Sequence, residues 1–315
     1  MASIVLLGGC AGGGEPPSLE RVEARTLPGA WVGPSYEDPD SSDRMAVRDD
    51  FVESSSSALP IAHFFYSWDR DPVVDGREDT VVDSGGLPMV SWNDADNERI
   101  ADGNDDERVR AAARRFAGLD GPVLLRWGWE MDADSGDGGT GTRGGPAEYV
   151  RAWRHLHDVF REEGADNVEW VWCPNAYAFT EQADRNPTEF YPGDDVVDWL
   201  CADGYNWYPS KGEWASFETI FEDFYSWAED VGKPIMIGEF GAQEDPADPA
   251  RRAAWIEDMA RTVKCEMRQI RGLVYFEEER AFDWRLSTSD QAIAAWRAVL
   301  ADTHFGGADD TIRCS

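Results

Sequence analysis

Short apolar runs alternate along the chain with longer stretches in which apolar residues recur every three or four positions. Runs this short and continuously apolar are typical of strands buried on both faces of a parallel sheet. The sequence predicts eight of them, at Gly29–Val32, Ile61–Tyr66, Pro88–Ser91, Val123–Trp127, Val168–Trp172, Val197–Cys201, Ile235–Ile237 and Leu273–Phe276.

The stretches between these runs have the spacing of amphipathic helices. In Ala147–Glu163 one stripe is apolar and Arg and Asp residues lie opposite; similar stripes occur within Phe217–Trp227, Ile256–Val263 and Ile293–Leu300. We expect the aromatic residues of these stripes to pack in the core, so no functional role is assigned to them.

Alternation of strand and helix implies a parallel sheet, and eight repeats within 315 residues imply a closed (β/α)8 barrel of the α/β class, formed by one domain. An open doubly wound sheet is the alternative, but it would need a Gly-rich phosphate loop after the first strand. The Gly-rich segment Gly136–Gly145 lies elsewhere, and we expect a flexible loop there over the barrel mouth. The barrel is predicted at residues 25–303, with a C-terminal tail at 304–315.

Charge adds information about the environment. The 42% apolar and 12% aromatic content supports a large core, yet 62 acidic residues face 29 basic ones, only three of them lysines, for a net charge of −33. Such a surface repels itself at low salt, and the repulsion is largely screened at about 1 M salt, where the Debye length is ~3 Å. The composition resembles that of proteins from halophilic archaea and predicts adaptation to high salt. It also argues against nucleic-acid binding, which requires basic surface.

Residues 1–24 read as a signal and a Gly-rich linker. Leu7-Gly8-Gly9-Cys10 follows a short apolar run and resembles a lipoprotein cleavage box, although basic residues before the run are missing. The expected product is an extracellular protein, lipid-anchored through Cys10 to the outer face of the cell membrane. A disordered tail is the alternative. No other stretch reaches the ~20 apolar residues of a membrane span.

The remaining cysteines, Cys173, Cys201, Cys265 and Cys314, have neither CxxC nor zinc spacing. Cys265 and Cys314 could form a disulfide, and buried free thiols are the alternative. No metal or organic cofactor is expected. The sequence leaves the oligomeric state open, with a monomer favoured.

Two glutamates directly follow apolar strands. Glu130 comes after Val123–Trp127 and Glu239 after Ile235–Ile237. Because catalytic groups of barrel enzymes stand at the C-terminal ends of strands, both should reach the same rim. A protonated and an ionised carboxylate across a sugar site are what glycoside hydrolysis needs. In an acidic chain, such a pair could also arise by chance.

The segments around these glutamates carry a family resemblance. LLRWGWEMD, VEWVWCPN, CADGYNW, KPIMIGEFG and FDWR occur in this order, each at a predicted strand end. Together they resemble glycoside hydrolase family 26, mostly β-mannanases with some mixed-linkage β-glucanases and β-1,3-xylanases. The resemblance covers roughly residues 29–300 and itself implies the barrel fold.

The resemblance implies roles for individual residues. Glu130 matches the family acid/base and Glu239 the nucleophile. Arg126 matches an arginine beside the catalytic carboxylates, Tyr205 a tyrosine that bonds the nucleophile, and Trp284 an aromatic platform under the sugar. Trp172 and Asn175 match the end of the fifth strand and are expected to line the cleft, and other tryptophans near strand ends suit an open sugar-binding cleft, among them Trp68, Trp92, Trp129 and Trp207.

One position departs from the family pattern. The residue before the acid/base is usually His, and here it is Trp129. This difference leaves the two-carboxylate chemistry in place but puts mannan specificity in doubt. The reading is a retaining endo-β-glycanase, with β-1,4-mannan ranked before mixed-linkage β-glucan or cellulose and β-1,3-xylan. A non-catalytic polysaccharide-binding barrel and a transglycosylase are the alternatives.

Overall fold

A computed structural model describes residues 25–33, 41–56, 59–93, 95–133 and 144–314, and for 41–47 only the backbone. Eight strands form one closed parallel barrel in chain order, with β8 pairing back onto β1. The predicted (β/α)8 barrel is therefore confirmed. The signal and linker expected at 1–24, and most of the expected Gly-rich loop, lie outside the described residues.

The strands are buried along nearly their whole length and coincide with the predicted apolar runs. They are β1 Leu27–Val32, β2 Ile61–Ser67, β3 Leu87–Asn93, β4 Val123–Trp127, β5 Val168–Trp172, β6 Trp199–Asn206, β7 Ile235–Ala242 and β8 Ile270–Glu277. The last three run further toward their C-terminal ends than predicted, and this extension carries Asp203, Tyr205 and Glu239 within strands.

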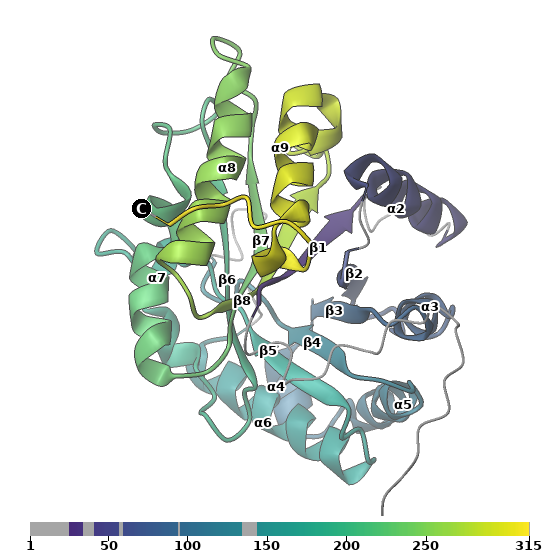
Figure 1. Cartoon of the computed structure of the whole chain (residues 1–315). Helices are drawn as coiled ribbons and strands as arrows, with labels where there is room; N and C mark the ends of the chain where they lie inside the picture. The colour runs from purple at the N-terminus through teal and green to yellow at the C-terminus, as the bar shows by residue number, and fades with distance from the viewer. Residues whose placement is uncertain (1–24, 34–40, 57–58, 94, 134–143, 315) are drawn as a thin grey trace, which may run out of the picture.

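Helices surround the barrel as an outer ring (Figure 1). They are α2 Ser41–Ser55, α3 Arg77–Asp83, α4 Asn97–Ala101, α5 Asp106–Ala117, α6 Pro146–Glu162, α7 Phe217–Val231, α8 Ala250–Cys265 and α9 Asp290–Ala301. The described residues also form four short 3-10 helices, at Ala176–Phe179, Pro187–Phe190, Leu286–Thr288 and Thr303–Phe305. Across the described residues, no helix combines the length and apolar character needed to cross a membrane.

The core has two layers, because successive strand residues point to opposite faces. One layer fills the space between barrel and helices and is almost wholly apolar. The other lies inside the barrel and contains aromatic, Met and Cys side chains beside a charged network. On β4, Leu124 and Arg126 point inward, whereas Leu125 and Trp127 belong to the outer layer.

The N-terminal end of the barrel, its foot, is closed by the end of the chain. Phe305 is buried, and Cys314 forms a disulfide with Cys265 at the end of α8. Asp302 is fully buried and accepts hydrogen bonds from the backbone of residues 304, 311 and 312. The C-terminal tail predicted at 304–315 is attached to the barrel by these contacts as far as Cys314.

Candidate active site

The backbone turns sharply where β4 ends. Gly128 and Glu130 have φ of +57° and +50°, and for Glu130 this left-handed conformation is uncommon. The Glu130 N–H donates to the carbonyl of Cys173 at 2.7 Å, so the turn is fastened to the end of β5. A non-glycine residue held in this region is a feature of functional sites. The Glu130 side chain is partly exposed.

Glu239 reaches the barrel interior through a bulge in β7. Strand pairing runs from Ala202 with Ile237 directly to Asp203 with Glu239, so Gly238 has no partner. An extra residue in a strand re-aims the side chains that follow it. Gly238 must lack a side chain, because a Cβ there would lie 2.8 Å from Asp203 Oδ1. The bulge therefore brings Glu239 to the same inner face as Asp203.

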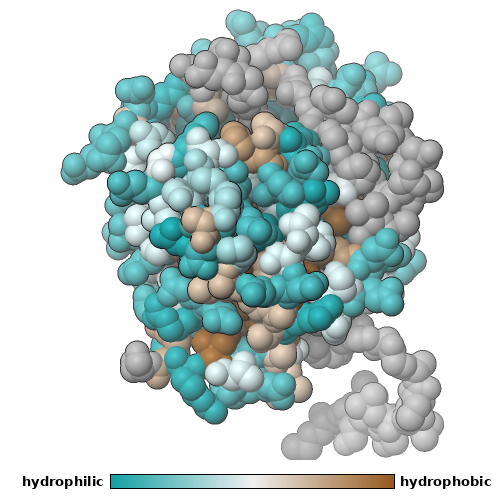
Figure 2. Space-filling model, turned by 90° about the horizontal axis from the view of Figure 1, so that it is seen from above, coloured by the Kyte–Doolittle hydropathy of each residue, from teal (hydrophilic) through white to brown (hydrophobic). Residues whose placement is uncertain are grey.

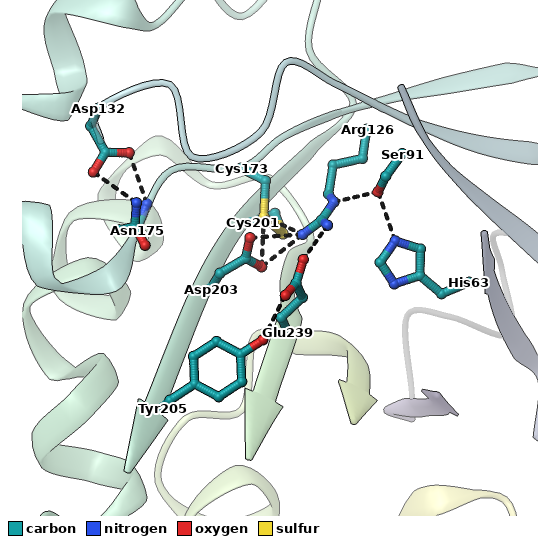
Figure 3. A network of polar contacts seen from close by, with 10 residues as sticks. All are labelled: His63, Ser91, Arg126, Asp132, Cys173, Asn175, Cys201, Asp203, Tyr205 and Glu239. Atoms are coloured by element: carbon teal, nitrogen blue, oxygen red, sulfur yellow. Dashed lines mark hydrogen bonds and ion pairs between the residues drawn. A yellow bond between two sulfur atoms is a disulfide. The ribbon is translucent and has the colours of Figure 1, made fainter. Parts of the chain in front are cut away.

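Arg126 connects the carboxylates of Asp203 and Glu239 (Figure 3). Its Nη1 lies 2.8 and 2.7 Å from the two carboxylate oxygens of Asp203, and its Nη2 donates to Glu239 Oε1. Burial disfavours the guanidinium charge, but Asp203 and Glu239 outweigh this effect and raise the pKa of Arg126. One permanent cation thus forms ion pairs with both Asp203 and Glu239.

Tyr205 holds the other oxygen of the same glutamate. Its hydroxyl donates to Glu239 Oε2 at 2.6 Å. Burial raises the pKa of Tyr205 well above its usual value, and the charges of Glu239, Asp203 and Glu130 act in the same direction. The phenol therefore stays protonated and remains a donor, and Glu130 belongs to the same electrostatic cluster.

Asp203 behaves differently from an ordinary ion-pair carboxylate. Burial raises its pKa well above the usual value, although Arg126 opposes that shift. The charges of Glu239 and Glu130 add to the effect of burial. Arg126 therefore faces two carboxylates of which Asp203 is the one that burial drives toward its neutral form.

A relay across β2 and β3 orients Arg126 from behind. The Arg126 Nε donates to Ser91 Oγ at 2.7 Å, so the proton of that hydroxyl is available to His63 Nε2, also at 2.7 Å. Burial, reinforced by the charge of Arg126, lowers the pKa of His63 well below its usual value. A neutral His63 can accept this hydrogen bond, as the relay requires.

A hollow of about 520 Å³ lies beside the network. Asp132 accepts from the backbone N–H of Asn175 at 2.9 Å and from its side-chain amide at 3.2 Å, and Asn175 pairs with Asp203 in the sheet. The side chains of Tyr177 and Trp207 at the hollow are exposed by 63% and 38%. Asp132, Asn175, Tyr177, Arg185, Trp207 and Lys211 are among the lining residues.

Aromatic rings surround the network on the inner side. Trp129 packs against Phe65 and lies under the Arg126 guanidinium, whose Cζ is 4.9 Å from the ring centroid. Trp284 contacts Tyr205 and Trp207, with ring centroids 4.6 and 5.2 Å away. The structure thus places Trp129, Trp207 and Trp284 around the Arg126–Glu239–Tyr205 group.

Three expected cleft residues lie elsewhere. Trp172 is fully buried in the outer layer, where its indole N–H donates to the carbonyl of Phe190 and its ring packs on Trp227. Trp68 stacks on the buried Trp92, at 4.3 Å between centroids, also in the outer layer. The predictions that Trp172 and Trp92 line the cleft are wrong, because both alternate outward along their strands, and Trp68 packs with Trp92.

The prediction had not included Asp203, Ser91, His63 as a relay residue, or the disulfide between Cys173 and Cys201. Strand alternation could have found Asp203, since it lies two residues before Tyr205 on β6. Cys173, Cys201 and Asp203 have the spacing of metal ligands, but the two sulfurs are bonded to each other and Asp203 is paired with Arg126. These residues as they stand do not fit a metal ion. The Cys265–Cys314 disulfide that the sequence left open is formed.

Comparison with known proteins agrees with these motifs. The sequence model of Glycosyl hydrolase family 26 matches residues 96–235. Endoglucanase H of Acetivibrio thermocellus is 31% identical over 284 residues, which cover 86% of this chain and 30% of that protein. Beta-1,3-xylanase TXYA of a Vibrio species is 26% identical over 62% of this chain and 44% of its own length. The chain thus spans less than half of each of these relatives.

Solved structures show the same fold at lower sequence identity. The catalytic domain of the GH26 endo-beta-1,4-mannanase from Bacillus sp. JAMB-750 superimposes with a TM-score of 0.64, covering 91% of this chain and 88% of that one at 16% identity.

Proposed function

Because this chain belongs to glycosyl hydrolase family 26, we propose that it is a retaining β-glycanase in which Glu239 is the nucleophile and Glu130 the acid/base. The observation that carries the proposal is the environment of Glu239. Arg126 binds one of its oxygens and Tyr205 the other, and its side chain is 6% exposed. These contacts fix the orientation of the carboxylate, as attack on an anomeric carbon requires.

The reaction follows from the two environments. Glu130, partly exposed at the turn after β4, protonates the leaving oxygen while Glu239 forms the glycosyl-enzyme bond. Glu130 then takes a proton from water, and that water releases the sugar from Glu239. Trp207 is 38% exposed and offers apolar ring surface near the nucleophile, which suits the flat face of a pyranose, whereas Trp284 and Trp129 are buried and support the network from within.

The proposed substrate is a β-1,4-linked polysaccharide, with β-mannan ranked first and β-glucan second. Mannan is favoured by the family resemblance, in which mannanases predominate. Glucan is the second candidate because Endoglucanase H is similar over 86% of this chain, and because Trp129 stands where mannanases usually carry His. β-1,3-Xylan is third. The hollow with Tyr177 and Trp207 suits further sugar units of any of these chains.

The test is hydrolysis of a polysaccharide panel by the wild type, Glu239→Ala, Glu130→Ala and Glu169→Gln. Glu169 is a control carboxylate near the start of β5, bonded to Trp199. We expect Glu239→Ala to abolish cleavage and Glu130→Ala to lower it about 10²–10⁴-fold, with Glu169→Gln active. On a dinitrophenyl glycoside, Glu130→Ala should keep its first step, because that leaving group needs no acid. If the wild type binds a polymer without cleaving any of the panel, the chain is a binding barrel and the proposal fails.

We further propose that the protein works in high salt. The face in Figure 2 is largely hydrophilic, with apolar colour confined to small scattered areas. All but three of the 29 basic residues of the chain are arginines, and many of the described arginines pair with acidic groups, as Arg110 does with Glu162 and Glu163 at 2.9 Å. Thermal unfolding should shift to higher temperature between about 0.1 and 1 M NaCl, where the Debye length falls from ~10 to ~3 Å. An unchanged or falling unfolding temperature would exclude this adaptation.

Export with a lipid anchor at Cys10 is a separate proposal that rests on residues outside the described part of the chain. It predicts that Cys10 carries lipid in the native host and that Cys10→Ser releases the protein from the membrane fraction. Mass spectrometry of the mature N-terminus tests it, and an unmodified N-terminal segment would refute it.

A further inference from the structure

A disulfide joins two neighbouring strands inside the barrel. Trp172 pairs with Leu200, so Cys173 and Cys201 follow in register on the inner face of β5 and β6. Their Cα atoms are 4.3 Å apart and both side chains are fully buried. The bond therefore lies in the barrel interior, next to Asp203 and Arg126 of the charged network (Figure 3).

The sulfurs of this disulfide touch the groups that hold Glu239. Cys173 Sγ lies 3.3 Å from Asp203 Oδ1 and 3.8 Å from Arg126 Nη1. A Cβ on Gly238 would lie 2.5 Å from Cys201 Sγ and 3.0 Å from Cys173 Sγ. Both sulfurs thus support the bulge that turns Glu239 inward, and one of them also borders the Asp203–Arg126 pair.

The same strand end is attached to the second glutamate. The carbonyl of Cys173 accepts the backbone N–H of Glu130 at 2.7 Å, and the carbonyl of Pro174 accepts that of Asp203 at 3.0 Å. A displacement of Cys173 would therefore move the supports of both glutamates together.

We propose that the Cys173–Cys201 disulfide is a positioning element for the two catalytic glutamates. The inference rests on the proposed function, in which Glu239 and Glu130 carry the reaction. The bonded pair lies against Gly238 and beside Asp203. In a close-packed interior, any displacement of this pair is transmitted to those neighbours.

The second disulfide is a matched control. Cys265–Cys314 lies at the foot and closes a separation of 49 residues, against 28 for Cys173–Cys201. Chain entropy predicts the larger stability loss for the longer loop. A merely structural role would make activity loss follow stability loss. A positioning role predicts the opposite order, with the smaller stability loss and the larger activity loss at Cys173–Cys201.

The experiment compares Cys173→Ala/Cys201→Ala with Cys265→Ala/Cys314→Ala, both against the wild type and Glu239→Ala. We expect the first double variant to lose at least tenfold in kcat with KM within threefold, because Arg126 no longer aligns with Glu239. The second should keep kcat within twofold while unfolding at lower temperature. If the first variant fails to fold, Cys173→Val/Cys201→Ala refills the space without the bond and should show the same kinetic loss.

Several results would overturn the inference. They are a wild-type kcat in the folded variant, an equal kcat loss in the foot variant, or free thiols at Cys173 and Cys201 in peptide mapping of the purified protein. A wild type that cleaves normally while the first variant matches it refutes the inference alone. A wild type that cleaves nothing refutes the proposed function, and the inference falls with it.

Discussion

The two ends of the barrel contain similar parts in different states. Each has a fully buried aspartate, a cation that pairs with it and a nearby disulfide: Asp203 with Arg126 at the mouth, Asp302 with Lys264 at the foot. Three backbone N–H groups bond Asp302, and together with Lys264 they lower its pKa in spite of the cost of burial. Asp203 is instead held by Arg126, and burial raises its pKa.

The difference separates structural from catalytic chemistry. A carboxylate surrounded by backbone donors is fully satisfied and holds its segment in place. A carboxylate that shares one guanidinium with Glu239 leaves the local charge balance adjustable, which is a feature of functional sites. Barrel enzymes commonly divide their ends in this way, with chemistry at the C-terminal ends of strands and stability at the other.

The largest expected effect comes from the cation at the mouth. Arg126→Lys keeps the charge but loses the planar fork that contacts Asp203 and Glu239 at once. Loss of two charge-assisted hydrogen bonds at ~1.5–3 kcal/mol each predicts a fall in kcat of about 10²–10⁴-fold. Lys264→Arg is the matched change at the foot and should leave kcat unaltered. Steady-state kinetics on the polysaccharide that the wild type cleaves fastest measures both kcat values. A similar loss of kcat in both variants would contradict the difference between the mouth and the foot.

A smaller effect is expected from the tyrosine that holds the same nucleophile. Tyr205→Phe keeps the ring packed on Trp284 but removes the hydrogen bond to Glu239 Oε2. One charged hydrogen bond of ~1.5–3 kcal/mol predicts a loss of about 10–10²-fold in kcat. Tyr275→Phe, which loses a bond to the carbonyl of Trp284, is a control for the missing hydroxyl. Equal kcat in Tyr205→Phe and the wild type would mean that Arg126 alone aims Glu239.

The barrel could be predicted from the sequence better than the site, because buried strands are recognisable as apolar runs. All eight strands and the two glutamates at strand ends followed from that pattern. Strand alternation would also have corrected the prediction that Trp172 lines the cleft. Val171 and Cys173 point inward, so Trp172 between them must point outward. The two-residue period of a strand therefore predicts an outward Trp172, whereas its position near a strand end favoured the cleft.

Other features of the site depend on three-dimensional packing and leave no local trace. The bulge at Gly238 shifts the register against β6, and the sequence Ile237-Gly238-Glu239 does not reveal which side Glu239 takes. The pairing of Cys173 with Cys201 requires the relative register of two strands. The attachment of residues 304–314 depends on Asp302, one acid among 62.

The buried aspartate of the foot should affect stability rather than rate. Asp302→Asn keeps the shape but weakens bonds to Lys264 and to three backbone N–H groups, which predicts a loss of about 1.5–3 kcal/mol in the free energy of unfolding. Its kcat should equal that of the wild type at temperatures where it is folded. Asp203→Asn should do the reverse, with a smaller stability loss, because burial already favours its neutral form, and a lower kcat. Chemical denaturation and kinetics on both variants test the pair, and a kcat loss in Asp302→Asn would contradict the division between the two ends.

The smallest expected effect is a pH dependence at the foot. Burial, reinforced by the charge of Lys264, lowers the pKa of His304 to about 4. The Thr26 hydroxyl donates to the carbonyl of Ile270, so His304 Nε2 supplies the proton of the 3.0 Å bond to Thr26 Oγ1. The folded state thus favours neutral His304, whereas the unfolded chain binds a proton near pH 6.5. The stabilisation is complete above pH 6.5 and is lost as the pH falls toward 4.

His304→Gln retains an amide donor but cannot titrate, so its unfolding temperature should fall less between pH 7 and 4.5, by about 2–4 °C after allowance for solvent screening. Parallel melting curves of the two proteins at four or five pH values measure this. Identical pH slopes would show that His304 titrates alike in both states, and the acid sensitivity of the fold would then be assigned to carboxylates whose pKa the fold lowers, such as Asp302.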